Sequence, residues 1–117
     1  MITINIKRND KNEIVKFSLE GHAGFAKSGN DIVCAAVSAI TNMIIIGFEK
    51  LNVIPEFEKD DDGFLSFELP CNLDFDTNQK IQFLLECMTE EFMDIQKNYK
   101  KDISVASVAE HCHLSAG

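Results

Sequence analysis

The sequence lacks any surplus of basic residues. It has 11 lysines and arginines against 19 aspartates and glutamates, which gives a formal net charge of -8 over 117 residues. Proteins that bind nucleic acid carry clusters of positive charge that neutralise phosphates, so direct nucleic-acid binding is not expected. An acidic surface keeps a protein soluble, and it also attracts a basic peptide or protein.

A targeting segment and a paired-cysteine motif are lacking as well. The first ten residues, MITINIKRND, contain no apolar region of the kind found in signal peptides. The longest apolar stretch, residues 32–48, is interrupted by Ser38, Thr41 and Asn42, which argues against a membrane-spanning helix. The four cysteines, at positions 34, 71, 87 and 112, form no CxxC pair. We therefore expect a cytoplasmic protein with free thiols and no disulfide framework.

What is present is the composition of one soluble globular domain. Apolar residues make up 45% of the chain and charged residues 26%. A chain of this length can bury roughly two thirds of its unfolded surface in a single core. Because no linker or low-complexity segment divides the sequence, we expect one domain over residues 1–117, with residues 110–117 as a flexible tail.

The first part of the chain predicts two strands and a helix. Isoleucines alternate with polar residues from position 2 to position 7, and a second alternation covers residues 15–20. With the turn RNDKN between them, these residues predict a β-hairpin. Residues 31–51 are apolar on nearly all sides, which predicts a buried central helix capped by Asn30 or Asp31.

The second part repeats this order. Strands are predicted at residues 53–59 and 64–69, and the DDDG between them favours a hairpin turn over a metal site. A second, amphipathic helix capped by Asp76 or Thr77 follows, and then a strand at residues 102–108. The apolar stripe of this helix consists of Ile81, Leu84, Leu85, Met88, Phe92, Ile95 and Tyr99. The order ββαββαβ indicates an α+β domain with a mostly antiparallel sheet.

One stretch, GHAGFAKSGNDIVCAAVSAI at residues 21–40, brings a histidine and a cysteine together. The cysteine stands at the start of the predicted helix, where free N–H groups and the helix dipole stabilise an anion such as a thiolate. A helix N-terminus and a neighbouring histidine both lower a cysteine pKa from about 8.5. Gly21, Gly24 and Gly29 allow the loop 21–30 to adopt positive φ and to move, so that His22 can reach Cys34.

The spacing by itself leaves alternatives open. Either Cys34 and His22 form a catalytic dyad, or Cys34 is a core residue and His22 a surface residue. Asp31 either orients His22 or caps the helix. Ser38, four residues after Cys34, either contacts the substrate or the thiol, or bonds to its own helix.

The remaining cysteines and histidines suggest no site. The HCH at residues 111–113 contains three groups that can bind metals, but adjacent residues rarely bind one metal together, and no second ligand set lies at zinc spacing. We therefore expect a tail there, no metal and no cofactor. Cys71 is interpreted as a loop thiol and Cys87 as a residue of the second helix.

Residues 21–40 resemble the signature of the bacterial ribosomal-processing cysteine proteases, in which GHAG, a glycine-containing loop and DIVCAAVS occur in this order. The chain length and the order ββαββαβ are similar too. The resemblance implies that His22 and Cys34 are the catalytic dyad of a homodimeric endopeptidase. It also implies the substrate, ribosomal protein L-twenty-seven, whose short N-terminal extension is removed after an apolar segment containing phenylalanine.

We therefore interpret the chain as a thiol protease of ribosome biogenesis. Cys34 is the nucleophile, His22 transfers protons, and N–H groups at the helix start, including that of Cys34, stabilise the oxyanion. The alternative is a ribosome-associated binding or assembly module without turnover. A thiol redox module is a third hypothesis, against which the missing CxxC partner argues.

Overall fold

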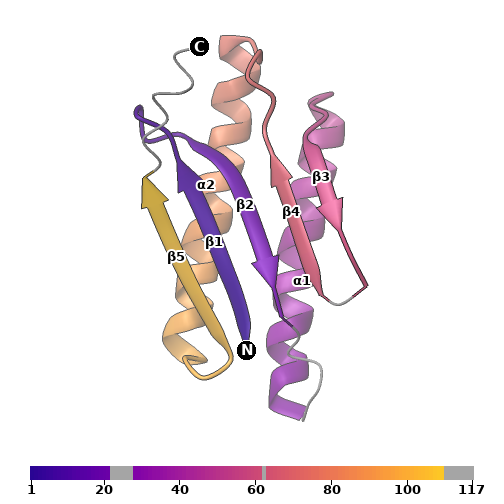
Figure 1. Cartoon of the computed structure of the whole chain (residues 1–117), viewed down its shortest axis with the longest axis vertical. Helices are drawn as coiled ribbons and strands as arrows, with labels where there is room; N and C mark the ends of the chain where they lie inside the picture. The colour runs from indigo at the N-terminus through magenta and orange to yellow at the C-terminus, as the bar shows by residue number, and fades with distance from the viewer. Residues whose placement is uncertain (22–27, 62, 110–117) are drawn as a thin grey trace.

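The computed structural model describes residues 1–21, 28–61 and 63–109, with the backbone alone at residues 28–31 and 109. Its elements are β1 (Ile2–Arg8), β2 (Ile14–Glu20), α1 (Ser28–Lys50), β3 (Glu56–Lys59), β4 (Phe64–Glu68), α2 (Phe75–Asn98) and β5 (Ile103–Ala109). The strands form one sheet in the order β3-β4-β2-β1-β5, and both helices cover the same face of it (Figure 1). The predicted fold class and element order are confirmed.

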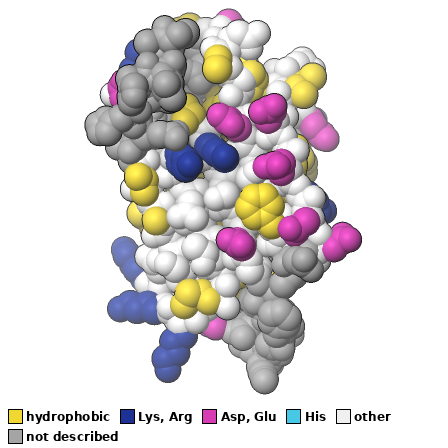
Figure 2. All heavy atoms as spheres, viewed as in Figure 1, with side chains coloured by type: hydrophobic (Ala, Val, Ile, Leu, Met, Phe, Trp, Pro, Cys, Tyr) yellow, Lys and Arg dark blue, Asp and Glu magenta, His cyan; other side chains and the backbone are white. Residues whose placement is uncertain are grey.

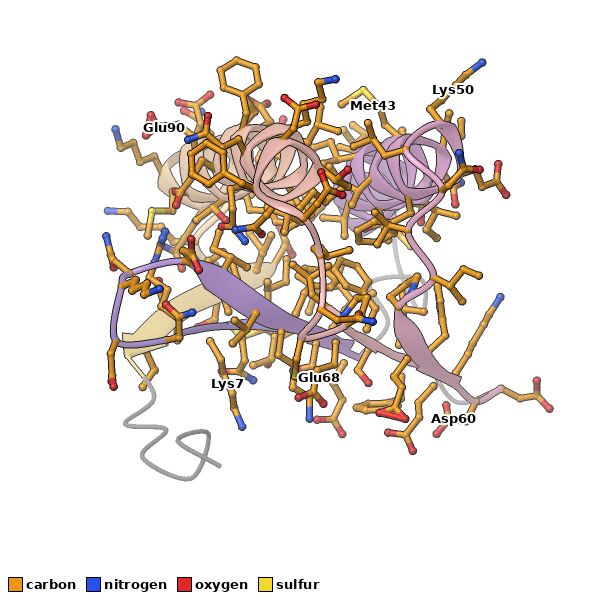
Figure 3. All side chains as sticks on the ribbon, turned by 90° about the horizontal axis from the view of Figure 1, so that it is seen from above. Lys7, Met43, Lys50, Asp60, Glu68 and Glu90 are labelled. Carbon is orange, nitrogen blue, oxygen red and sulfur yellow. The ribbon has the colours of Figure 1, made fainter. Side chains whose placement is uncertain are left out.

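The sheet is mixed, with most pairings antiparallel. β1 pairs antiparallel with β2 and parallel with β5, while β4 pairs antiparallel with both β2 and β3. Because side chains alternate along a strand, the register places Ile6, Phe17 and Phe67 in one row toward the helices. The opposite side, here called the open face, has no helix over it, and Figure 3 shows Lys7 and Glu68 pointing outward there.

Four phenylalanines form the centre of the core between the sheet and the helices. Phe17 stacks with Phe67 and Phe92 at ring-centroid distances of 4.9 and 5.9 Å, and Phe48 meets Phe67 edge-on at 4.9 Å. All four side chains are buried, and each comes from a different element. Such ring pairs contribute about 0.5–1.5 kcal/mol beyond the area they bury, so this cluster ties both helices to the sheet.

Two glutamines of α2 complete the hydrogen bonding of the sheet. The side chain of Gln82 accepts from the N–H of Ile14 and donates to its carbonyl, both at 2.8 Å. This contact lies beside the irregularity that shifts the register between β1 and β2. Gln96 accepts from the N–H of Val105 at 2.6 Å. The helix therefore satisfies backbone groups that the sheet itself leaves unpaired.

Both helix starts differ from the sequence prediction. α1 begins at Ser28, so Asn30 and Asp31 lie inside it and the predicted cap is wrong. α2 is capped by Asp74, whose carboxylate accepts from the N–H of Thr77 at 3.1 Å. The prediction of Asp76 or Thr77 as the cap is therefore also wrong.

The two helices are buried on the side that faces the sheet. In α2 the predicted stripe is confirmed at Ile81, Leu85, Met88, Phe92 and Ile95, whereas Leu84 is half-buried and Tyr99 ends the helix. α1 was expected to be buried on all sides, yet Ile32, Met43 and Ile46 are 60%, 56% and 51% exposed. Figure 3 shows Met43 pointing away from the sheet. Residues Ile32–Lys50 are long and apolar enough to cross a membrane by composition, but here their other side supplies the domain core.

The connections agree with the sequence where they are described. β3 and β4 form an antiparallel hairpin, as DDDG predicted, although β3 is shorter than expected. Asp60 accepts from the N–H of Phe64 at 3.0 Å, and Gly63 has a φ of 91°. Cys71 and Cys87 are exposed free thiols in the predicted loop and helix. The HCH sequence lies outside the described residues.

Candidate active site

Cys34 lies in the second turn of α1 and not in the first, because the helix begins at Ser28. Its side chain is half-buried and packs against the core. A backbone N–H in the second turn bonds to the carbonyl four residues earlier, so the N–H of Cys34 is not a free oxyanion donor, contrary to the prediction. Within α1 the amides without such a partner are those of residues 28–30.

This position also changes the electrostatic argument for a thiolate. The influence of the helix dipole falls off within the first turn, so the N-terminus of α1 stabilises a negative charge on Cys34 less than the sequence suggested. His22, which was predicted to supply a neighbouring cation, lies outside the described residues, as does Gly24.

Gly21 fixes the start of the segment that carries His22. Its φ is 107°, and a Cβ at this position would lie only 2.2 Å from the carbonyl oxygen of Met1. Its N–H donates to the carbonyl of Gly63 at 3.2 Å. The positive φ and the close approach both require glycine, which confirms the predicted conformation at Gly21. The contact with Gly63 was not predicted, because only the register of β2 and β4 brings these two glycines together.

The loop after Gly21 is shorter than predicted. α1 contains Gly29, so the connection between β2 and α1 spans residues 21–27. In Figure 1 the end of β2, the start of α1, the chain N-terminus and the β3–β4 turn all lie at the same end of the molecule. This end therefore carries the N-terminal part of α1 and the beginning of the loop with His22.

Asp31, Cys34 and Ser38 lie along one side of α1, since they are three and four residues apart. The side chain of Asp31 is not described. Ser38 is exposed. The hydroxyls of Thr41 and Thr89 donate to the carbonyl four residues earlier, but no such bond from Ser38 occurs in the described part of the chain. The role of Ser38 as a supporting site residue stays a prediction.

Comparison with known proteins identifies the family of the chain. Residues 1–104 match the protein family described as cysteine protease Prp. The chain belongs to this family. It is 38% identical over 113 residues to the ribosomal processing cysteine protease Prp of Bacillus subtilis (strain 168), with 92% of this chain and 97% of that protein covered. It is 31% identical over 112 residues to Prp of Staphylococcus aureus, with 88% and 95% covered.

Solved structures share the fold of this Prp-family chain. The essential ribosomal processing protease Prp from S. aureus, in complex with a covalently linked product peptide, has a TM-score of 0.78 and 28% identity, covering 92% of this chain and 99% of that one. The same protease in complex with a substrate peptide has a TM-score of 0.78 and 27% identity, with the same coverage. The resemblance that residues 21–40 indicated is confirmed, and with it membership of a cysteine protease family.

Proposed function

We propose that this Prp-family protein is a cysteine endopeptidase that removes the N-terminal extension of ribosomal protein L-twenty-seven. It cuts after an apolar segment containing phenylalanine, in the cytoplasm, and the cut is needed for ribosome maturation. Family membership over residues 1–104, with a cysteine in the second turn of α1, carries this proposal. The covalently linked product peptide of the S. aureus relative supports covalent peptide chemistry.

Cys34 and His22 divide the reaction between them. The Cys34 thiolate forms a bond from Sγ to the scissile carbonyl carbon, and the carbonyl electron pair moves to the oxygen, next to N–H groups of the first turn of α1. When that pair returns, the C–N bond breaks and the imidazolium of His22 gives its proton to the leaving amine. Water then attacks the thioester while His22 accepts its proton, which releases the new carboxylate and restores the thiolate.

The other predicted site residues take supporting roles. Asp31 orients His22, and the exposed hydroxyl of Ser38 contacts the bound peptide. Gly21 anchors the loop, while Gly24 allows it to move when the peptide enters; Gly29, predicted to be a loop residue, lies in α1. Such a movement would give the peptide access to Cys34, whose side chain is half-buried.

A homodimer is the other part of the proposal. The outer side of α1 carries exposed apolar or small side chains at helical spacing, namely Ile32, Ala35, Ala39, Met43 and Ile46. A stripe of this kind suits close packing against a second helix, because small residues let the two backbones approach. We propose that two copies of α1 pack along this stripe. Met43→Asp is then expected to shift the protein from dimer to monomer in sedimentation experiments.

A digest of the candidate ribosomal protein tests the activity. The purified protein is incubated with the unprocessed substrate, and the products are weighed by mass spectrometry. We expect one cut after the apolar segment, loss of that cut in Cys34→Ser and His22→Ala, and an unchanged rate in Cys71→Ser, which removes an exposed thiol outside the site. An intact substrate after incubation with the wild-type protein would contradict the proposal.

A further inference from the structure

The open face of the sheet carries a shallow groove that peptide cleavage at Cys34 does not use. The groove crosses β2, β4 and β3, and its volume is about 280 Å³. Figure 2 looks onto this face and shows acidic side chains gathered over β3 and β4. The residues that line the groove are Lys16, Glu56, Phe57, Glu58, Ser66 and Glu68.

The strand register places like charges directly opposite each other in this groove. Glu68 on β4 is paired with Glu56 on the edge strand β3, and Glu58 follows on the same face of β3. Like charges in directly opposite positions destabilise a sheet. Lys16 lies across from Glu68 on the other side, but no ion pair joins these two side chains in the described part of the chain. Three carboxylates against one ammonium leave the groove negatively charged.

The floor of the groove offers one hydroxyl group to a ligand. Ser66 is only 3% exposed, and its hydroxyl has no hydrogen-bond partner among residues 1–21, 28–61 and 63–109. Among the described residues no fully buried side-chain oxygen or nitrogen lacks a partner, so this unpaired hydroxyl opens onto the groove that Ser66 lines, where a polar group of a ligand can reach it. Protection of an edge strand explains charges on β3. It does not explain Glu68, which lies one strand further in.

We infer that this groove binds a lysine- or arginine-rich segment of a polypeptide. A cationic side chain lies between Glu56, Glu58 and Glu68, and one of its N–H groups donates to the hydroxyl oxygen of Ser66. Charge complementarity selects this occupant, since charge-assisted hydrogen bonds to carboxylates are stronger than neutral ones. A cation also relieves the repulsion between Glu56 and Glu68.

The groove is continuous with the end of the molecule that carries the candidate active site. β4 runs from the groove back to Phe64 over about 13 Å, at the spacing of residues in a strand. The preceding residue, Gly63, contacts Gly21 at the start of the loop. A basic segment in the groove can therefore belong to the same polypeptide that is cut at Cys34. This part of the inference rests on the proposed function.

Binding is tested without any cleavage. A synthetic peptide of glycine and lysine is titrated into the whole protein by calorimetry at low salt, with the same peptide carrying acetyl-lysines as the uncharged control. The variant Glu56→Gln/Glu58→Gln/Glu68→Gln is expected to bind the lysine peptide about tenfold more weakly, since exposed ion pairs are individually weak. Ser66→Ala is expected to weaken binding without any change in charge.

A control variant with the same net charge as the groove variant distinguishes binding in the groove from general attraction of a basic peptide to an acidic protein. Glu90→Gln/Glu91→Gln/Asp94→Asn removes three exposed carboxylates from α2, on the helix side, where Figure 3 shows Glu90. We expect its affinity to stay within about twofold of the wild type, as for screened charges that lie far from the ligand. Equal losses in both triple variants, equal binding of the acetylated peptide, or no binding to the wild type would overturn the inference.

Cleavage kinetics distinguish this inference from the proposed function. Two substrates are compared, one ending shortly after the cut and one extended by a lysine-rich segment. In the groove variant the KM for the extended substrate is expected to rise about tenfold, with kcat and the shorter substrate unaffected. An unchanged KM would overturn the inference alone. No cleavage of either substrate by the wild type would overturn the proposed function, and the binding titration would still decide whether the groove takes a basic segment.

Discussion

Replacing Gly21 with alanine perturbs the contact from which the His22 loop starts. The alanine would have to adopt a φ of 107° and place its Cβ 2.2 Å from the carbonyl oxygen of Met1. An unfavourable backbone conformation costs about 1–3 kcal/mol. Displacement of Met1 also weakens the adjacent hydrogen bond of 2.9 Å from Ile2 to Asp102, which contributes about 1 kcal/mol. We expect Gly21→Ala to lower the free energy of unfolding by about 2–4 kcal/mol.

Urea unfolding followed by helix circular dichroism measures this loss, and Gly47→Ala is the matched control. A Cβ on Gly47 in α1 would meet only the end of the Leu84 side chain, at 2.8 Å, and that side chain can rotate. Alanine is also favoured over glycine inside a helix by about 1 kcal/mol. The free energy of unfolding of Gly47→Ala is therefore expected to stay within about 1 kcal/mol of the wild-type value. Equal urea midpoints for Gly21→Ala and the wild type would refute the reasoning about Gly21.

Three further predictions concern other contacts. Gln82→Ala leaves the N–H and carbonyl of Ile14 without their side-chain partner, so urea unfolding should show a free energy of unfolding lower by about 2–3 kcal/mol. A decrease of less than half that amount would mean that water replaces the side-chain amide of Gln82 as the partner of Ile14. The hydrogen bond from Arg8 lowers the pKa of Glu86 below its ordinary 4.5, so the stability it contributes is present above that pH and disappears as acid protonates the carboxylate. Because Glu86 is half exposed, Glu86→Gln should lower the free energy of unfolding by at most about 1 kcal/mol at neutral pH and leave it unchanged in acid. A difference in unfolding free energy between variant and wild type that does not depend on pH would contradict this. Iodoacetamide near pH 6.5 should label Cys34 faster than the two exposed thiols if His22 activates it, whereas labelling in order of exposure, read by peptide mapping, would indicate an unactivated thiol.

Local patterns in the sequence were sufficient to predict the order of the elements but not their ends. Alternation of isoleucines in β1 and the apolar stripe of α2 depend on neighbouring residues, and both were predicted correctly. Helix starts depend on a choice among several suitable caps, and α2 uses Asp74 in preference to Asp76. Residues 31–51 are apolar on nearly all sides, so the pattern could not show which side of α1 faces the sheet. Packing against α2 and the sheet decides this, and it leaves Met43 exposed.

The candidate site was predictable to a similar extent. The motif around Cys34 was enough to indicate the family, which the match over residues 1–104 confirms. The position of Cys34 in the second turn depends on where α1 begins, and the contact between Gly21 and Gly63 depends on strand register, so neither follows from spacing along the chain. The groove on the open face escaped prediction for the same reason. Glu56 and Glu68 are neighbours only once β3 and β4 have paired.

Acid quenching of the enzyme during turnover, followed by peptide mass spectrometry, tests Cys34 as the nucleophile most directly. A thioester is stable in acid long enough to be weighed, and the substrate fragment on the N-terminal side of the cut remains on the residue that attacked it. We predict this fragment on the peptide that contains Cys34, and its absence from the same peptide in Cys34→Ser. An acyl group on any other residue, or cleavage at the wild-type rate by Cys34→Ser, would contradict the assignment of Cys34 as the catalytic thiol.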